Sequence, residues 1–357
     1  MKEEQRRLNK PIRYNEKWRD KCEADAPSGI KPTIRLKTPN EGETILKDLI
    51  QGEIRIANDQ IDDMVLIRSD GTPTYMLSVV VDDHDMGVNT VIRTSDHLTN
   101  AFRQMMIINA LNWDIPTYAH MPLILSKEGE KLSKDNGLMT ISETRELGYL
   151  PEALLSYLLG LGWHHESEDI VDIYEAFKSF DVKDMVKSPA KFDIAKLNHI
   201  NGYFIRKADD KRLAELIKPL IFNSLGFFEE EKQELLIKSM HLLKKRSKNL
   251  IELAVMAEFI VEERPIMISN ASRKIISQGQ DILRLVIKAI EPIQNFDYDN
   301  IKEAIQELIS KQGLQIEQIA PLIRATVSGS ESSPPIFSVM EIMGKDEIIK
   351  RIEDQIC

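Results

Sequence analysis

Residues 120–139, HMPLILSKEGEKLSKDNGLM, decide how the rest of the chain is interpreted. The apolar run 121–125 has the length of a buried strand and leads into a loop that contains Lys127, Lys131 and Lys134. Lysine carries a compact charge on a flexible stem, which suits it to bind phosphate oxygens. Ligands of open α/β sheets bind at loops that follow the carboxyl ends of strands. A single lysine-rich loop is more often a solvated surface turn, so the interpretation depends on its surroundings.

The composition is typical of a globular protein with two or three domains. The 357 residues are 42% hydrophobic and 29% charged. The two cysteines, Cys22 and Cys357, provide neither a disulfide framework nor a cysteine-rich zinc site. No apolar stretch approaches the ~20 residues of a membrane span, and the charged start MKEEQRRLNK is not a secretory signal. We therefore expect a cytoplasmic protein with no membrane partner.

The charge is unevenly distributed along the chain. The net charge of −10 argues against a nucleic-acid partner, because such domains are usually basic. Residues 1–37, however, hold eleven lysines and arginines against six acidic residues, and a second basic cluster lies at residues 244–248. The net charge alone therefore does not decide whether the protein binds nucleic acid.

The first third of the chain has the pattern of a β-rich module. Runs with a period of two occur at residues 33–37, 53–56 and 64–68, which predicts half-buried strands. An apolar run at 75–81 follows, and then the polar sequence DDHD at 82–85. These four residues could form a metal cluster, but acidic groups that close a helix are the commoner case.

The next segment predicts half of a doubly wound α/β domain. A strand is expected at 90–93, with Ser95 or Asp96 as the N-cap of a helix that runs to residue 111. A strand at 118–125 and the lysine loop follow, and then two helices. Beyond Trp163, apolar residues at three- and four-residue spacing predict an almost wholly helical region. The predicted helices span residues 142–147, 151–161, 212–222, 229–243, 249–262, 271–292, 298–313, 315–327 and 345–356.

At this point the residues resemble a known family, the bacterial glutamyl-tRNA synthetases, which are class I aminoacyl-tRNA synthetases. Six runs match in order over most of the chain. They are YMLSVVVDDHDMGVNTVIRTSDHLTNAFRQ, HMPLILSKEGEKLSKDNG, GYLPEALLSYLLGLGWHHE, SPAKFDIAKLNHINGYFIR, APLIRATVSGSESSPPIF and IMGKDEIIKRIE. The four residues KLSK alone would be a weak signal, but six ordered matches are strong.

The resemblance implies an ATP site at the lysine loop. Residues 131–134, KLSK, match the loop that holds the ATP triphosphate, with Lys131 and Lys134 as the catalytic residues. Lys134 would provide most of the charge stabilisation during displacement at the α-phosphate. The ATP pocket would also include Ser133, Leu132 and Asp96, and Mg²⁺ would bind with ATP.

The resemblance also implies sites for the other two substrates. Tyr75, Arg93 and His97 match positions that recognise glutamate, and an arginine can bind a carboxylate bidentately. The alternatives are a tyrosine at the edge of the core, a surface arginine, and a helix cap in the case of Asp96. Arg324 lies in the anticodon-binding region, where a structural role and an anticodon-facing role are equally expected.

The implied fold is α/β plus all-α, with four regions. Residues 1–72 would be a β-rich insertion that binds the tRNA acceptor end, and 73–150 the second half of a Rossmann-type catalytic domain. Residues 151–210 would contact the tRNA stem, and 211–357 would form a helical anticodon-binding domain.

The chain departs from the family pattern in several places. It has no His-Ile-Gly-His motif, so we expect the first half of the catalytic domain to be absent before Met1. Asp135 replaces a basic residue, and Thr94-Ser95 replaces a more typical Gly-Asp or Gly-Glu. The zinc knot of some relatives has no ligands here, so no structural zinc is expected.

The expected activity is that of a glutamate–tRNA ligase, which this chain is not expected to complete alone. The competing interpretation is a non-catalytic tRNA-binding protein. A paralogue that glutamylates a modified tRNA base is a third, which the long helical region disfavours. The resemblance leaves open whether tRNA(Gln) is charged besides tRNA(Glu). We expect a monomer.

Overall fold

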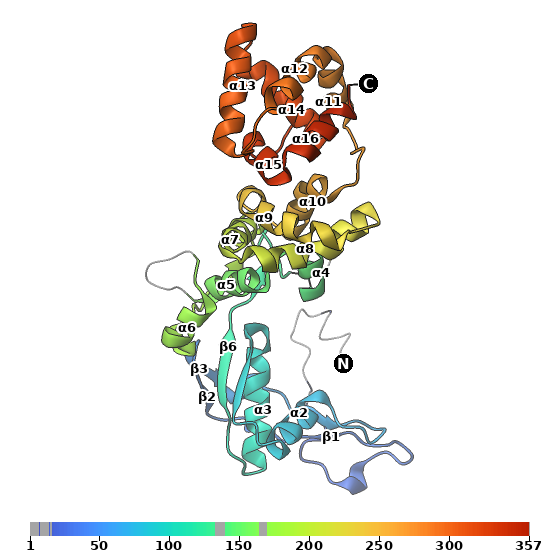
Figure 1. Cartoon of the computed structure of the whole chain (residues 1–357). Helices are drawn as coiled ribbons and strands as arrows, with labels where there is room; N and C mark the ends of the chain where they lie inside the picture. The colour runs from blue at the N-terminus through green and yellow to red at the C-terminus, as the bar shows by residue number, and fades with distance from the viewer. Residues whose placement is uncertain (1–6, 8–13, 15, 133–139, 164–169, 357) are drawn as a thin grey trace. The chain divides into compact units, whose positions relative to one another are not determined.

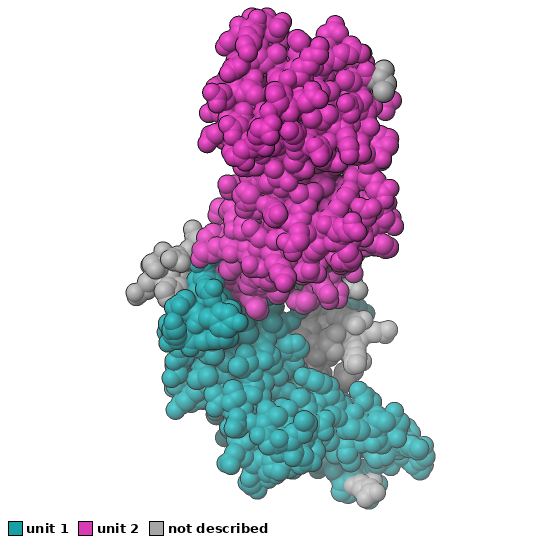
Figure 2. Space-filling model, viewed as in Figure 1, with its two compact units in different colours: residues 1–138, 158–192 teal, residues 139–157, 193–357 magenta. Residues whose placement is uncertain are grey.

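A computed structural model describes residues 7, 14, 16–132, 140–163 and 170–356 of the chain. The chain forms two units, which are coloured separately in Figure 2. Unit 1 comprises residues 1–138 and 158–192, and unit 2 comprises residues 139–157 and 193–357.

Unit 1 contains a mixed four-stranded sheet with the strand order β3-β2-β6-β5 (Figure 1). Strands β2 (Glu43–Asp48) and β3 (Gly52–Ala57) form an antiparallel hairpin. Strands β5 (Thr90–Thr94) and β6 (Thr117–Met121) are parallel, and β6 also pairs in parallel with β2. Helix α3 (Leu98–Ala110) lies between β5 and β6 in the chain, as a parallel pair requires. The carboxyl ends of β5 and β6 therefore lie at one edge of the sheet.

The strands at residues 33–37, 53–56, 64–68 and 90–93 are confirmed. The structure places β1 (Ile34–Arg35), β3, β4 (Val65–Ile67) and β5 at these positions. Strand β2 has no predicted counterpart, and its pairing joins the hairpin from residues 1–72 to strand β6. The predicted boundary at residue 72 therefore runs between strands of one sheet.

The single strand predicted at 118–125 is wrong, because the structure divides it in two. Strand β6 ends at Met121, and β7 (Ile124–Leu125) pairs with β8 (Ala190–Lys191) in a separate two-stranded sheet. Pro122 lies between them and has no N–H with which to continue the ladder. The lysine loop therefore follows β7 and not the central strand β6.

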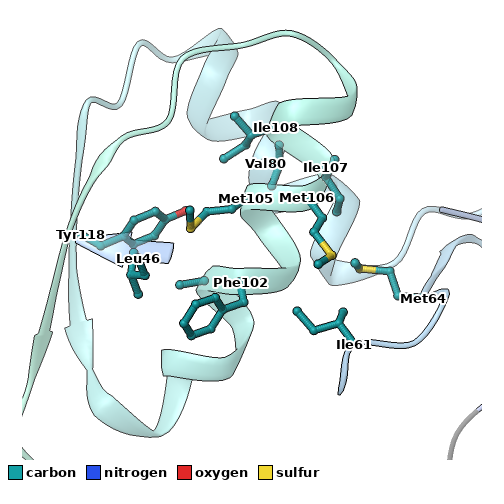
Figure 3. Packing of buried hydrophobic residues seen from close by; sticks show 11 residues of the cluster. Leu46, Ile61, Met64, Val80, Phe102, Met105, Met106, Ile107, Ile108 and Tyr118 are labelled. Atoms are coloured by element: carbon teal, nitrogen blue, oxygen red, sulfur yellow. The ribbon is translucent and has the colours of Figure 1, made fainter. Parts of the chain in front are cut away.

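The core of unit 1 fills the space between the sheet and two helices, α3 and α2 (Tyr75–Asp85). Figure 3 shows the side chains of α3 directed towards Leu46 and Tyr118 on the strands and towards Ile61 and Met64. Complete burial of one such side chain stabilises the fold by roughly 1.5–3 kcal/mol. Six of the core residues come from α3, namely Ala101, Phe102, Met105, Met106, Ile107 and Ile108.

The acidic run 82–85 lies at the end of α2. His84 stacks on Trp113 with the ring centroids 3.7 Å apart, and its Nδ1 lies 3.1 Å from Asp85 Oδ1. Among the described residues no cluster of His, Cys, Asp and Glu side chains is suited to hold a metal ion.

The side chain of Asp48 joins the β2–β3 turn to strand β6. It is fully buried and accepts hydrogen bonds from the backbone N–H groups of Ile50 (3.0 Å), Gln51 (2.8 Å) and His120 (3.1 Å). It also lies 2.6 Å from Nδ1 of His120, which is equally buried. Burial alone would raise the pKa of Asp48, but the hydrogen bonds from Gln51 and His120 outweigh burial and lower it. Asp48 therefore remains ionised inside unit 1.

Unit 2 is helical, and several of its helices begin at side-chain caps. Asp193, Asp209, Asn249 and Asp297 each accept a hydrogen bond from a backbone N–H in the first turn of the helix that follows. No helix among the described residues is long and apolar enough to cross a membrane.

The remaining helices are divided between the two units. Helix α6 (Ile173–Ser179) lies in unit 1, and the last residues of α5 also belong to unit 1. The helices that lie or begin in unit 2 are α4 (Ile141–Glu146), α5 (Pro151–Gly162), α7 (Ile194–Lys207), α8 (Asp210–Leu225), α9 (Gln233–Leu243), α10 (Leu250–Val261), α11 (Asn270–Gln278), α12 (Gln280–Ile290), α13 (Tyr298–Gln312), α14 (Ile316–Ser328), α15 (Ile336–Met343) and α16 (Lys345–Glu353).

The predicted helices of unit 2 are confirmed apart from one. The single helix expected at 271–292 is wrong, because Gly279 separates α11 from α12. Leu322 of α14 packs within 2.4 Å of the place that a β-carbon on Gly279 would occupy. The absence of a side chain at Gly279 therefore permits this close approach. Helices α7 and α15 have no counterpart among the predicted helices.

Arg351 of α16 is a buried charge that joins three helices. Only 1% of it is exposed, and its Nη1 donates to the carbonyl oxygens of Phe259 and Val327 at 2.7 Å each. These carbonyls belong to the last turns of α10 and α14. Nε of Arg351 donates to Glu347 on its own helix at 2.7 Å, so the buried charge is paired.

A substitution at Gly329 tests the packing of unit 2. Gly329 has φ +68°, and an added β-carbon would lie 2.1 Å from the carbonyl oxygen of Met267. Gly313 is a matched control, because it has φ +65° and nothing within 4 Å. We expect Gly313→Ala to cost about 1–2 kcal/mol of unfolding free energy, from backbone strain alone, and Gly329→Ala to cost clearly more. Urea unfolding followed by far-ultraviolet circular dichroism checks this, and equal costs would contradict it.

The buried pair of Asp48 and His120 makes the stability of unit 1 depend on pH. Burial lowers the pKa of His120 from 6.5, although Asp48 opposes this. A histidine whose pKa is lowered in the folded state contributes its full stabilisation at pH values above 6.5. This contribution is lost as the pH falls from 6.5 towards the lowered pKa. The lowered pKa of Asp48 acts in the same direction from 3.8 downwards. We therefore expect unit 1 to be less stable at about pH 5.5 than at about pH 7.5.

Tryptophan fluorescence during urea unfolding measures this, because all three tryptophans, Trp18, Trp113 and Trp163, lie in unit 1. A parallel NMR titration should place the midpoint of the His120 ring below 6.5. A midpoint at or above that value would contradict the prediction.

Candidate active site

The described part of the lysine loop is a tight turn after strand β7. The backbone N–H of Ser126 donates to the carbonyl oxygen of Glu130 at 2.8 Å, and Gly129 has φ +90° within this turn. Lys131 then pairs with Leu125 in an isolated antiparallel bridge. Leu132 is half-buried. Ser133 and Lys134, the other two residues of KLSK, lie outside the described residues, as does Asp135.

Lys131 contacts Asp96, which follows the carboxyl end of β5. Its Nζ lies 2.5 Å from Oδ2 of Asp96, and the hydroxyl of Thr94 donates to Oδ1 of Asp96 at 2.5 Å. These two donors, Lys131 first, lower the pKa of Asp96 to about 2, so that it is ionised at neutral pH. The two charged side chains are 65% and 29% exposed. An exposed pair of this kind is worth 0–1 kcal/mol and is screened by salt.

The predicted helix cap at Ser95 or Asp96 is wrong. A short 3-10 turn, η3 (Ser95–His97), precedes α3, and neither element has a side-chain cap. The carboxylate of Asp96 instead accepts from Thr94 and Lys131. The side chain of His97 lies beside it, with Nε2 4.0 Å from Oδ1 of Asp96, and its Nδ1 is 3.2 Å from Nδ2 of Asn100. The structure therefore brings three of the predicted residues together, namely Lys131, Asp96 and His97.

Arg93 points into a second group of side chains. Its Nε donates to Nε2 of His120 at 3.1 Å, and its Nη2 donates to Oε1 of Gln104 at 2.9 Å. The guanidinium carbon lies 5.5 Å from the centre of the Tyr118 ring. An arginine has no acceptor, so Nε2 of His120 must accept and its proton must reside on Nδ1, which faces Asp48. His120 is therefore neutral in this arrangement.

Sequence analysis gave no role to Asp48, Gln104 or His120. Gln104 carries a detectable signal, because it is a polar residue directly before the apolar run Met105–Ile108 of α3. His120 opens the stretch that decides the fold, but a lone histidine in a strand has no specific meaning. Asp48 carries no signal, because its partner is 72 residues away in the chain.

Two predicted residues belong to neither group. Tyr75 is the first residue of α2 and is 53% exposed, and it shares no hydrogen bond with Arg93 or Asp96 in the described part of the chain. Arg324 belongs to α14 in unit 2, where its Nε donates to the hydroxyl of Ser333 at 3.0 Å. Nη1 of Arg246 donates to the carbonyl oxygen of Ser333 at 2.8 Å, so two arginines meet there.

Two pockets occur in the described residues, and the first borders the group around Arg93. One of about 280 Å³ is in unit 1 at the amino ends of β5 and β6, where Gln104 and Tyr118 contribute to its lining. Another of about 480 Å³ is in unit 2 and includes Met267 and Arg273. Neither is lined by Arg93, Asp96 or Lys131. The candidate site is therefore identified by side-chain chemistry at the carboxyl edge of the sheet.

Comparisons with known proteins cover the whole chain. Residues 1–199 match a family model described as tRNA synthetases class I (E and Q), catalytic domain, and residues 212–356 match an anticodon binding domain. Glutamate--tRNA ligase 2 of Zymomonas mobilis is 44% identical over 360 residues, a match that covers 100% of this chain and 75% of that protein. The protein of the same name from Paramagnetospirillum magneticum is also 44% identical, with 99% of this chain and 75% of that protein covered.

The fold agrees with the sequence match. A crystal structure of a glutamate tRNA ligase from Elizabethkingia meningosepticum, in complex with its amino acid, matches with a TM-score of 0.83 and 26% identity. The match covers 99% of this chain and 76% of that chain. The predicted α/β plus all-α fold, with a class I catalytic region and a helical anticodon-binding region, is confirmed. This chain belongs to the glutamate–tRNA ligase family of class I tRNA synthetases.

Proposed function

We propose that this protein is a glutamate–tRNA ligase, which activates glutamate with ATP and transfers the glutamyl group to the 3′ end of tRNA(Glu). The observation that carries the proposal is the 44% identity to glutamate--tRNA ligases along the whole chain. The catalytic-domain model matches the first part of the chain and the anticodon-binding model matches the part that follows. The partners are ATP, glutamate and tRNA, with Mg²⁺ bound alongside ATP. A monomeric state and a cytoplasmic location remain predictions.

The nucleotide end of the site consists of the lysine loop and Asp96. The oxygens of a triphosphate need cationic donors on movable stems, and Lys131 and Lys134 provide them, with Ser133 and Leu132 between. ATP supplies the activated α-phosphate, at which a carboxylate oxygen of glutamate displaces pyrophosphate. Nζ of Lys131 lies 2.5 Å from Asp96 in an exposed ion pair of low energy. The ammonium group of Lys131 can therefore leave Asp96 and pair with a phosphate at little cost in free energy. The lysines would then stabilise the negative charge that develops at the α-phosphate.

The amino-acid end of the site consists of Arg93, with Tyr75 and His97 as further contacts. A guanidinium group matches a carboxylate in charge and in geometry, so Arg93 is assigned to the side-chain carboxylate of glutamate. Its contacts to neutral groups, His120 and Gln104, leave its positive charge uncompensated by a carboxylate within hydrogen-bonding distance in the described part of the chain. This residual charge supports the assignment.

The tRNA contacts are assigned by region. We place the acceptor end at residues 1–72, the second half of the catalytic domain at 73–150, the stem at 151–210 and the anticodon at 211–357. Arg324 is the proposed anticodon contact, and the nearby Arg246 adds a second cation around Ser333. Whether tRNA(Gln) is charged as well is settled by an assay with both tRNAs.

The test is glutamate- and tRNA-dependent ATP–pyrophosphate exchange, together with charging of tRNA by labelled glutamate. One arm uses the purified chain alone. The other adds a polypeptide with the part of the Zymomonas mobilis relative that lies outside the match. Charging of tRNA(Glu) in either arm is the expected result. Absence of exchange and charging in both arms would contradict the proposal.

The alternative function is a non-catalytic tRNA-binding protein. The observation that favours it is the match of residues 212–356 to an anticodon binding domain, which such a protein would use without catalysis. Its signature would be saturable binding of tRNA(Glu), measured by filter retention, with no exchange or charging in either arm. The two functions therefore give different results in the same set of assays.

The lysine loop gives a more specific prediction. We expect Lys131→Ala and Lys134→Ala each to reduce pyrophosphate exchange on the order of 10²-fold, because each removes a donor that stabilises the developing charge. Lys127→Ala is the matched control, since Lys127 is an exposed lysine in the same loop but outside KLSK. It should change exchange less than threefold, roughly the scale of a surface substitution. Equal losses for Lys127→Ala and Lys131→Ala would contradict the assignment.

A further inference from the structure

Gln104 is a buried amide on helix α3, most of whose buried side chains are apolar. It is 3% exposed, and the two residues that follow it on α3, Met105 and Met106, belong to the hydrophobic core. A buried amide destabilises a fold unless its polar atoms are hydrogen-bonded. The side-chain hydrogen bond at Oε1 joins Gln104 to Nη2 of Arg93, on strand β5. The position of Gln104 is therefore explained by Arg93 and not by the core.

The two partners of Arg93 lie along one edge of its guanidinium group. Nε donates to His120 and Nη2 donates to Gln104, and these two nitrogens form the side-on edge of the planar group. The partners come from different elements, since His120 is on β6 and Gln104 is on α3. Two bonds from separate elements fix both the direction and the roll of the guanidinium plane.

The opposite, end-on edge of the guanidinium group remains available. It consists of Nη1 and the second proton of Nη2, and no described residue forms a hydrogen bond with Nη1. A carboxylate binds such an edge through two parallel N–H···O bonds. Protein groups thus bind the side-on edge of the Arg93 guanidinium and leave its end-on edge available for a ligand.

His120 serves as an acceptor only because of Asp48. The carboxylate of Asp48 lies 2.6 Å from Nδ1 of His120, so the ring proton is held there and Nε2 keeps its lone pair for Arg93. Both side chains are fully buried, so solvent does not compete for these bonds. The order Asp48, His120, Arg93 is therefore a continuous chain of donors and acceptors, whose first two members are fully buried.

We propose that Gln104 and His120 are positioning residues that direct the end-on edge of Arg93 to the side-chain carboxylate of the amino-acid substrate. The proposal rests on the proposed function, because it takes glutamate as the ligand of Arg93. Gln104 and His120 do not touch the substrate themselves. They act by holding the guanidinium plane before the substrate arrives, which lowers the entropy lost on binding.

The test compares Gln104→Met, which keeps the length of the side chain and removes the acceptor, with Met106→Leu as a buried control on the same helix. The first readout needs no substrate. Arginine ¹⁵N NMR measures rotation about the Nε–Cζ bond of Arg93, with Arg93→Lys to assign the signal. Gln104→Met should accelerate this rotation about tenfold, and Met106→Leu should leave it unchanged. Should Gln104→Met fail to fold, Gln104→Asn replaces it, because the shorter side chain withdraws the acceptor.

The second readout is kinetic, in whichever arm of the exchange assay is active. Gln104→Met should raise the KM for glutamate about tenfold, roughly the value of one hydrogen bond to a charged group, and leave the KM for ATP within twofold. Arg93→Ala separates a failure of the glutamate assignment from a failure of the positioning role. If it leaves the KM for glutamate unchanged, the assignment of glutamate to Arg93 fails. If Arg93→Ala raises that KM but Gln104→Met alters neither rotation nor KM, the positioning role alone is overturned.

Discussion

The buried carboxylate of Asp48 is the constraint on which unit 1 depends. An ionised group in the interior is tolerated only when its oxygens are fully hydrogen-bonded. Asp48 meets this condition by gathering N–H groups from its own turn and from His120 on the neighbouring strand. A shift of β6 against β2 by one residue would remove half of these donors. The carboxylate thus fixes the pairing of the two strands, and through His120 it fixes the orientation of Arg93.

The two proposed ends of the candidate site differ in physical character. At the amino-acid end, Arg93 is held by buried neutral partners whose own protons are determined by Asp48. At the nucleotide end, Lys131 and Asp96 form an exposed ion pair that water and salt screen. A rigid end suits discrimination between similar amino acids. An end with loosely held charges suits a ligand that arrives, reacts and leaves as pyrophosphate.

The sequence was sufficient wherever the determining interaction is local. The alternating residues of β1, β3 and β4 and the apolar spacing of the unit 2 helices predicted their elements because neighbours in the chain are neighbours in space. Strand β2 could not be predicted from local sequence, because its pairing with β6 depends on a residue about seventy positions away. The helix break at Gly279 was not predicted for the same reason, since it reflects the close approach of Leu322 from another helix.

The same distinction applies to the site. Lys131, Asp96 and Arg93 were found because a family pattern marks them along the chain. The residues that orient Arg93 come from β2, α3 and β6, and only the folded structure brings them together. The expected cap at Asp96 failed because a lysine from the loop after β7 offers its carboxylate a stronger donor than a helix N–H.

The buried guanidinium of Arg351 has a consequence for how the C-terminal region unfolds. It donates to the final turns of α10 and α14, where the partial negative charge of each helix dipole is concentrated. If α16 detached while the other two helices stayed in place, two buried carbonyl oxygens would lose their donor. Fraying of the last helix is therefore coupled to the opening of both others. The three helices behave as one cooperative unit, in which a local opening costs nearly as much as a complete one.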